Sequence, residues 1–170
     1  PDSQSSLADP RIPADGRSLV VGATDRELSD WTIGEWLAHT ASVQGQSAAC
    51  VFSAERKRWT WTELRDHSDA LAGALLELGF ARGDRVGIWA PNRSDWILAQ
   101  YATARIGVIL VNINPAYRFA ELEYALNKVE CRGLLTAHAF KTSHYVSMLQ
   151  TLAPELGTAR PGELFAARLP

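Results

Sequence analysis

Apolar side chains recur at intervals of three and four residues in several stretches of the chain, a spacing that predicts amphipathic helices. A Thr-x-x-Glu capping box, Thr32 and Glu35, begins the first of them. Gly79 followed by Phe80 predicts a Schellman motif at the end of the longest helix, and Gly107 is the expected C-cap of the next. The predicted helices cover residues 33–45, 62–79, 94–107, 122–129 and 145–152.

Short apolar or β-branched runs lie between these helices and predict strands. The runs at 48–53 and 58–61 flank a charged turn and predict a β-hairpin. The β-branched run at 108–113 is typical of a strand buried on both faces, and further strands are expected at 85–90 and 132–136. Strands that alternate with helices predict an α/β fold of βαβ units, with a mostly parallel sheet flanked by helices and an N-terminal β-hairpin.

Composition divides the chain into three expected parts. Residues 1–31 are rich in Pro, Asp, Ser and Gly without sustained periodicity, which predicts an extended N-terminal arm. Residues 32–153 form the predicted α/β subdomain, and residues 154–170 lose periodicity and read as an irregular segment. The first residue is Pro1 rather than Met, so the sequence leaves open whether a targeting segment was removed.

The charge balance narrows the range of partners. Seventeen Lys and Arg against nineteen Asp and Glu give a net charge of −2, without the basic excess that nucleic-acid binding usually shows. The longest apolar run, residues 106–113, is too short to span a bilayer, so we expect no transmembrane segment and a cytoplasmic location. Arg outnumbers Lys by 14 to 3, a bias that favours a bacterial source.

The sequence lacks the short motifs that usually mark catalytic, redox or metal-binding sites. The two cysteines, Cys50 and Cys131, form no C-x-x-C pair, which excludes a disulfide framework, a zinc ribbon and a thioredoxin-like site. The four histidines lack the spacing of a zinc helix, and no G-x-S-x-G elbow or glycine-rich phosphate loop occurs. We therefore assign no catalytic, cofactor-binding or metal-binding residue.

Two other local patterns favour structural roles. Trp59 and Trp61 would lie on the same face of a hairpin strand, where packing against a helix is more common than ligand binding. Asn92-Arg93-Ser94 matches a glycosylation sequon, but its place between a strand and a helix predicts that Asn92 or Ser94 caps the helix.

The segment "VNINPAYR" carries the candidate site residues. A parallel strand that ends in polar residues places Asn114, Tyr117 and Arg118 at the carboxyl edge of the sheet, where open α/β folds bind ligands. We interpret these three residues as substrate-binding or as support for a binding cleft. The alternative is that Asn114-Pro115 is turn chemistry and that Arg118 is a solvated loop residue.

Two longer segments resemble a known family. "RWTWTELRDHSDALAGALLELGFARGDRVGIWAPN" and "ATARIGVILVNINPAYRFAELEYALNKVECRGLL" resemble the first two signature segments of the adenylate-forming superfamily of acyl-CoA synthetases, adenylation domains and luciferases. The resemblance runs from about Thr32 to the end of the chain. With "AFKTSHYVSML" and "PGELFAARLP", it is nearest to medium-chain acyl-CoA synthetases of the type called acyl-CoA synthetase family member 2.

The resemblance implies an ATP-dependent reaction in two steps. A fatty acid and ATP give an acyl-adenylate and pyrophosphate, and the thiol of CoA then displaces AMP. ATP, Mg²⁺ and CoA are thus the implied cofactors and co-substrates of a parent ligase. In relatives the triphosphate loop, the ribose-binding Asp, the Mg-binding Glu and the catalytic Lys lie beyond the matched segments, so none of these ligands is expected to bind this chain alone.

We therefore expect the chain to be the N-terminal portion of a fatty acyl-CoA ligase, the first subdomain of its large N-terminal domain, inactive alone and partnered by the rest of its own chain. A homodimer is left open. A second hypothesis is a free-standing, non-catalytic interaction module related to the same superfamily. A third, an intact flavodoxin-like nucleotide binder, is disfavoured because no glycine-rich turn follows any predicted strand.

Overall fold

The computed structural model describes Asp25 and residues 27–160 and 162–170. The chain divides into two units, Pro1–Asp30 and Trp31–Pro170, and the architecture below is that of the second. Most of the expected arm at 1–31 lies outside the described residues. The helices are α1 (Ile33–Gln44), α2 (Trp61–Glu77), α3 (Ser94–Ile106), α4 (Phe119–Lys128) and α5 (Tyr145–Leu152), and the strands are β1 (Ala48–Phe52), β2 (Lys57–Thr60), β3 (Arg85–Trp89), β4 (Ile109–Asn112) and β5 (Gly133–Thr136).

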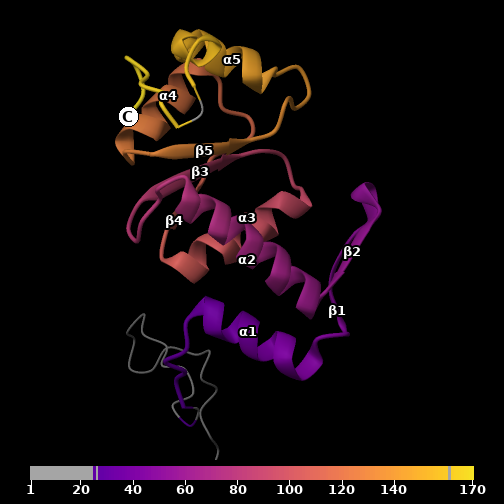
Figure 1. Ribbon diagram of the computed structural model, residues 1–170. Coiled ribbons are helices and arrows are strands. Elements are labelled where there is room, and N and C mark those ends of the chain that lie inside the picture. Colours follow the sequence, from indigo (N-terminus) through magenta and orange to yellow (C-terminus); the bar gives the residue numbers. More distant parts are fainter. Residues whose placement is uncertain (1–24, 26, 161) are drawn as a thin grey trace, which may run out of the picture. The chain divides into compact units, whose positions relative to one another are not determined.

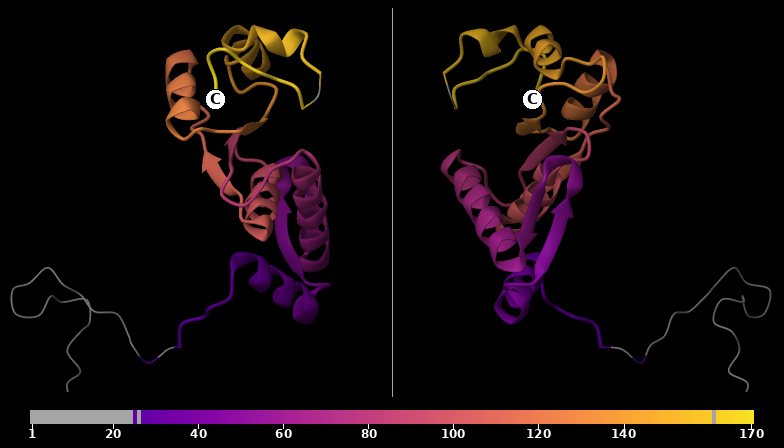
Figure 2. Two further views of the ribbon diagram at one scale, coloured as in Figure 1. Left: turned by 60° about the vertical axis from the view of Figure 1, so that its left-hand side comes forward. Right: turned by 90° about the vertical axis from the view of Figure 1, so that its right-hand side faces the viewer.

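A three-stranded parallel sheet with the order β4-β3-β5 forms the centre of this unit. Figures 1 and 2 show α4 and α5 on one face of the sheet and α2 and α3 on the other. Strands β1 and β2 form a separate antiparallel hairpin that contacts α2. The predicted α/β class, the parallel sheet flanked by helices and the hairpin are confirmed.

The central strand β3 sends alternate side chains into two hydrophobic layers, as the pleat of a strand requires. Val86 and Ile88 pack toward α2 and α3. Trp89 packs toward α4 and α5, and Gly87 faces the same side. The layer under α4 and α5 is the larger one, and its buried members are Trp89, Ile113, Leu122, Leu126, Cys131, Tyr145, Met148 and Leu152.

The predicted caps at Thr32, Gly79 and Gly107 are confirmed. Thr32 and Glu35 form the capping box of α1, with the Glu35 amide donating to Thr32 Oγ1 over 3.2 Å. Gly79 adopts a φ of +85°, and the Phe80 amide donates to the Leu75 carbonyl over 3.1 Å, which is the Schellman arrangement. The hydrogen bonds that end and begin these helices are therefore encoded locally.

Two predictions about helix starts are wrong. Trp61 is not a strand residue beside Trp59 but the first residue of α2, because Thr60 and Glu63 form a second capping box that begins the helix there. Neither Asn92 nor Ser94 caps α3 with its side chain, since the N-cap position is Arg93 and it makes no side-chain cap. The partner of this helix end is Glu55, described below.

The expectation that the run 108–113 is buried on both faces is wrong for part of it. Strand β4 lies at an edge of the sheet, and Ile109 and Asn112 are exposed. The crossovers through α3 and α4 place β4 and β5 on opposite sides of β3, so that β3 takes the protected central position. From Val86 to Trp89 every residue of β3 is buried.

Among the described residues after α5, the only regular element is a short 3₁₀ helix, Pro154–Gly157. The end of the chain lies against α4. Arg168 forms a two-pronged ion pair with Glu123, with distances of 2.9 and 2.6 Å. Leu169 packs against the layer under α4 and α5, so this segment contributes to the core although it lacks periodicity.

Candidate functional site at the carboxyl edge of the sheet

Because the three strands are parallel, their carboxyl ends lie at one edge of the sheet, followed by residues 90–93, 113–118 and 137–144. We call this region the carboxyl edge. It contains all three predicted site residues, Asn114, Tyr117 and Arg118, in the connection from β4 to α4.

Residues 114–118 form a tight turn with its own internal hydrogen bonds. Asn114 Oδ1 accepts from the Ala116 amide over 2.9 Å, which is an Asx turn. The Asn114 carbonyl also accepts from the Tyr117 amide over 3.0 Å. The Asn114 side chain is thus used by the turn, as in the alternative interpretation of the sequence.

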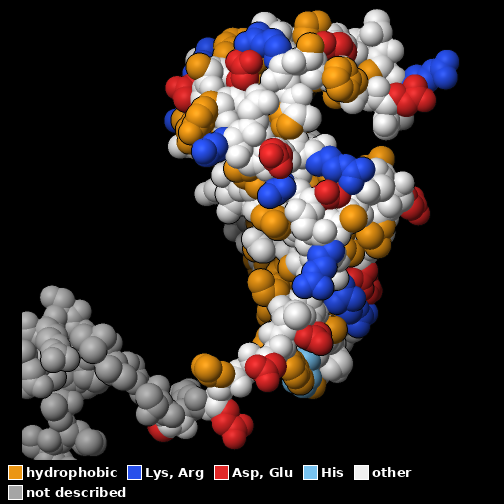
Figure 3. All heavy atoms as spheres, turned by 90° about the vertical axis from the view of Figure 1, so that its left-hand side faces the viewer, with side chains coloured by type: hydrophobic (Ala, Val, Ile, Leu, Met, Phe, Trp, Pro, Cys, Tyr) orange, Lys and Arg blue, Asp and Glu red, His pale blue; other side chains and the backbone are white. Residues whose placement is uncertain are grey.

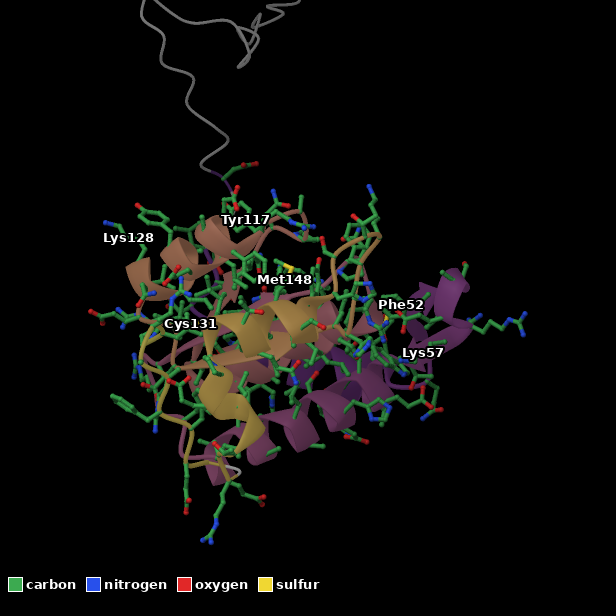
Figure 4. All side chains as sticks on the ribbon, turned by 90° about the horizontal axis from the view of Figure 1, so that it is seen from above. Phe52, Lys57, Tyr117, Lys128, Cys131 and Met148 are labelled. Carbon is green, nitrogen blue, oxygen red and sulfur yellow. The ribbon has the colours of Figure 1, made fainter. Side chains whose placement is uncertain are left out.

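Tyr117 and Arg118 have different environments. The Tyr117 ring is half-buried against the layer under α4 and α5, which also contains Met148; both residues are labelled in Figure 4. Arg118 is the N-cap residue of α4: its amide donates to the Glu121 carboxylate over 3.1 Å, and its guanidinium donates to Ser143 Oγ over 2.8 Å. Arg118 is therefore not an isolated loop residue but a link between the loops that follow β4 and β5.

Two buried aromatic side chains donate hydrogen bonds to backbone carbonyls of the same turn. Trp89 Nε1 donates to the Asn114 carbonyl over 3.1 Å, and the Tyr145 hydroxyl donates to the Pro115 carbonyl over 2.5 Å. The two rings stack with a centroid separation of 3.7 Å and an interplanar angle of 19°. Burial raises the pKa of Tyr145, so its hydroxyl remains a donor at neutral pH.

The hairpin turn contacts the first residue of α3, next to the carboxyl edge, through Glu55. Its carboxylate accepts from the Ser94 amide and from Ser94 Oγ, both over 2.7 Å, and pairs with Lys57 at 3.0 Å. These hydrogen bonds from Ser94, followed by those of Lys57, lower the pKa of Glu55 from 4.5 to about 2. Sequence reasoning missed this contact, because nothing local relates Glu55 to a helix that begins 39 positions later.

A cavity of about 580 Å³ lies beside the carboxyl edge, on the face of the sheet that carries α2 and α3. Its wall is mainly apolar, and its polar members include Arg93 and Asp95, which form an ion pair of 2.7 Å. The full lining is Leu71, Ile88, Ala90, Arg93, Asp95, Leu98, Leu135, Thr136, Ala137 and His138. The lining is thus mostly apolar, with polar groups contributed by Arg93, Asp95, Thr136 and His138.

The described residues contain no cluster of three His, Cys, Asp or Glu side chains suited to a metal ion. The residues present therefore do not fit a Mg²⁺ site, and we derive no step through that ion here.

Burial raises the pKa of the Cys131 thiol, and likewise that of Cys50, so neither is an activated nucleophile. Within the part of the chain that the structure describes, no helix has the length and apolar character needed to cross a membrane.

Comparison with known proteins agrees with this arrangement. The family model described as AMP-binding enzyme matches residues 37–164, which is most of the chain and includes the whole sheet. The chain belongs to the AMP-binding enzyme family. It is 43% identical over 159 residues to the medium-chain acyl-CoA ligase ACSF2, mitochondrial, of Rattus norvegicus, and 35% identical over 144 residues to the putative acyl-CoA synthetase YngI of Bacillus subtilis.

These alignments cover 94% and 85% of this chain but only 26% of each relative, so the chain spans about a quarter of their length. Solved structures agree on the fold. The N-terminal domain of FACL13 from Mycobacterium tuberculosis has a TM-score of 0.66 at 22% identity, covering 79% of this chain and 32% of that one. A putative long-chain-fatty-acid CoA ligase from Rhodopseudomonas palustris has a TM-score of 0.59 at 27% identity, covering 65% and 28%. The chain thus shares its α/β fold with part of these ligase structures, in agreement with the fold that the resemblance implies.

Proposed function

We propose that this chain is the N-terminal part of an ATP-dependent fatty acyl-CoA ligase. The observation that carries the proposal is the 43% identity to a medium-chain acyl-CoA ligase through 94% of the chain. The reaction would join a fatty acid and CoA through an acyl-adenylate, with ATP cleaved to AMP and pyrophosphate. As the resemblance implies, ATP, Mg²⁺ and CoA would bind mainly to residues outside this chain.

Within that enzyme, we assign the carboxyl edge a supporting role. Asn114, Tyr117 and Arg118 would shape one wall of the substrate cleft rather than perform chemistry. The geometry supports this assignment because Asn114 is used by its own turn and Arg118 by Ser143. No catalytic residue is assigned to this chain.

The substrate class can be tested in the protein expressed from its whole reading frame. Acyl-CoA formation would be measured with ATP, Mg²⁺, CoA and saturated acids from acetate to palmitate, with benzoate as an aromatic control. We expect acids of intermediate length to give the highest kcat/KM. An optimum at acetate or benzoate would contradict the medium-chain assignment, and no turnover with any acid would favour the non-catalytic module.

The 170-residue chain by itself should not form acyl-adenylate. Exchange of labelled pyrophosphate into ATP, dependent on added fatty acid, should stay at the level of a blank without protein. The protein from the whole reading frame serves as the positive control. Clear exchange by the purified 170-residue chain would show that it contains a complete adenylation site and would contradict this proposal.

A cytoplasmic location in a bacterium and a homodimeric state also remain proposals. A relative from Bacillus subtilis supports a bacterial setting, whereas the relative from Rattus norvegicus is described as mitochondrial. Fractionation of source cells would test the location, and light scattering at several concentrations would test the dimer. Recovery in a membrane or organelle fraction would contradict the first proposal, and a concentration-independent monomer the second.

A further inference from the structure

The turn 114–118 is held by more than its own hydrogen bonds. Two successive carbonyls, those of Asn114 and Pro115, each accept a hydrogen bond from a buried aromatic side chain. Trp89 ends the central strand and Tyr145 begins α5, and both side chains are fully buried. A hydroxyl and an indole N–H in a dry core need partners, and the turn supplies both of them.

The arrangement joins three chain segments at one point. Trp89 comes from the end of β3, the carbonyls follow β4, and Tyr145 follows β5. The two side chains that donate also stack on each other, with ring centroids 3.7 Å apart. Arg118 adds a second link, from the start of α4 to Ser143, two residues before Tyr145. The end of β3 and the connections that follow β4 and β5 are thereby joined to one another.

We propose that Trp89 and Tyr145 are positioning residues, which set the turn 114–118 so that the carboxyl edge can form part of the substrate cleft. This inference rests on the proposed ligase function. Neither residue touches substrate in this role. Trp89 donates to the Asn114 carbonyl and Tyr145 to the Pro115 carbonyl. Through these hydrogen bonds the two residues would set the backbone of the turn and so the orientation of Tyr117 and Arg118, which follow in it.

The test compares Tyr145→Phe with Tyr124→Phe in the protein expressed from its whole reading frame. Tyr145→Phe removes the hydroxyl but keeps the ring that stacks on Trp89. Tyr124 on α4 is 68% exposed, which makes the same substitution there a matched control. Trp89→Phe, which removes the indole N–H and keeps an aromatic ring, is a second variant with the same expected direction.

Two readouts are needed. Hydrogen exchange at the Ala116 and Tyr117 amides should become about three- to tenfold faster in Tyr145→Phe, the factor expected for one ordinary hydrogen bond. Steady-state kinetics should show a KM for at least one substrate raised by about the same factor, with kcat within about twofold of wild type. A merely structural role for the hydroxyl would lower the melting temperature without separating KM from kcat.

The outcomes are distinct. Unchanged exchange at Ala116 and Tyr117 would overturn the inference, and so would faster exchange with wild-type KM and kcat in an active enzyme. Effects of the same size in Tyr124→Phe would also overturn it. If the wild-type protein turned over no acid at all, the proposed function would fail, and this role would fail with it.

Discussion

Glu55 caps helix α3 from outside the helix, through two hydrogen bonds to Ser94. The amide and the hydroxyl of Ser94 both donate to the Glu55 carboxylate over 2.7 Å. The carboxylate thus lies where a helix N-terminus favours a negative charge. This relationship attaches the turn of the hairpin to the sheet domain, and it explains why no side chain of α3 itself performs the capping.

Replacing this carboxylate should loosen the hairpin. Glu55→Gln keeps the size of the side chain but removes the charge that faces Ser94 and Lys57, so we expect a lower melting temperature. Differential scanning calorimetry measures it. Glu130→Gln is a suitable control, because Glu130 is largely exposed and pairs with Arg85 only at 3.5 Å. Equal melting temperatures for Glu55→Gln and wild type would contradict the capping role.

The same contact should make stability depend on pH. The pKa of Glu55 is lowered from 4.5 to about 2 in the folded chain, chiefly by its hydrogen bonds with Ser94. The stabilisation is therefore fully present above about pH 4.5 and is lost as the pH falls toward 2. The melting temperatures of wild type and Glu55→Gln should differ at pH 7 and converge as the pH falls from 4.5. A difference that stays constant down to pH 2.5 would speak against this assignment.

Two glycine substitutions should have opposite effects. A Cβ atom at Gly87, in the central strand, would lie 2.9 Å from Ile113 Cδ1 and from Leu134 Cδ1, so Gly87→Ala should destabilise the fold by about 1–3 kcal/mol. A Cβ atom at Gly73, within α2, meets no atom within 4 Å, and Gly73→Ala should stabilise by about 0.5–1 kcal/mol. Urea unfolding of both variants measures the difference. A neutral Gly87→Ala would show that the sheet does not pack as closely as described.

The 170-residue chain should bind a hydrophobic dye and associate with itself. On α1, the outer side chains Ile33, Trp36 and Val43 are 52%, 47% and 61% exposed, although other residues of the same helix are buried. Figure 3 shows hydrophobic side chains reaching the surface in several places among the charged ones. Dye fluorescence and light scattering in native buffer measure both effects. A monodisperse chain that leaves the dye dark would instead favour a self-sufficient module.

Much of this fold could be predicted because its signals are local. The capping box at Thr32, the glycine at 79 and the apolar spacing of α4 each depend on residues within one or two turns. The turn at Asn114 could be placed at the carboxyl edge for the same reason, since it directly follows a strand.

The remaining features depend on contacts between distant parts of the chain. Glu55 caps a helix 39 positions away, and Tyr145 binds a carbonyl 30 positions before it. Contacts between residues so far apart in the chain produce no periodic or compositional pattern in the sequence. The central position of β3 could not be predicted from hydrophobicity either. The apolar run at 108–113 is more hydrophobic than the segment of β3, yet it forms the edge strand β4. Strand order is decided by the handed crossovers rather than by hydrophobicity alone.

The order β4-β3-β5 has a consequence for synthesis on the ribosome. Strand β3 leaves the exit tunnel before either of its neighbours, so both of its edges stay open until the segments of β4 and then β5 have emerged. During that interval Val86 and Ile88 can be covered by α2 and then by α3, whereas Trp89 lacks α5, so chaperones that bind nascent chains are the available cover for that face. We expect the nascent chain to be most sensitive to such chaperones from the appearance of β3 until α5 closes the second face.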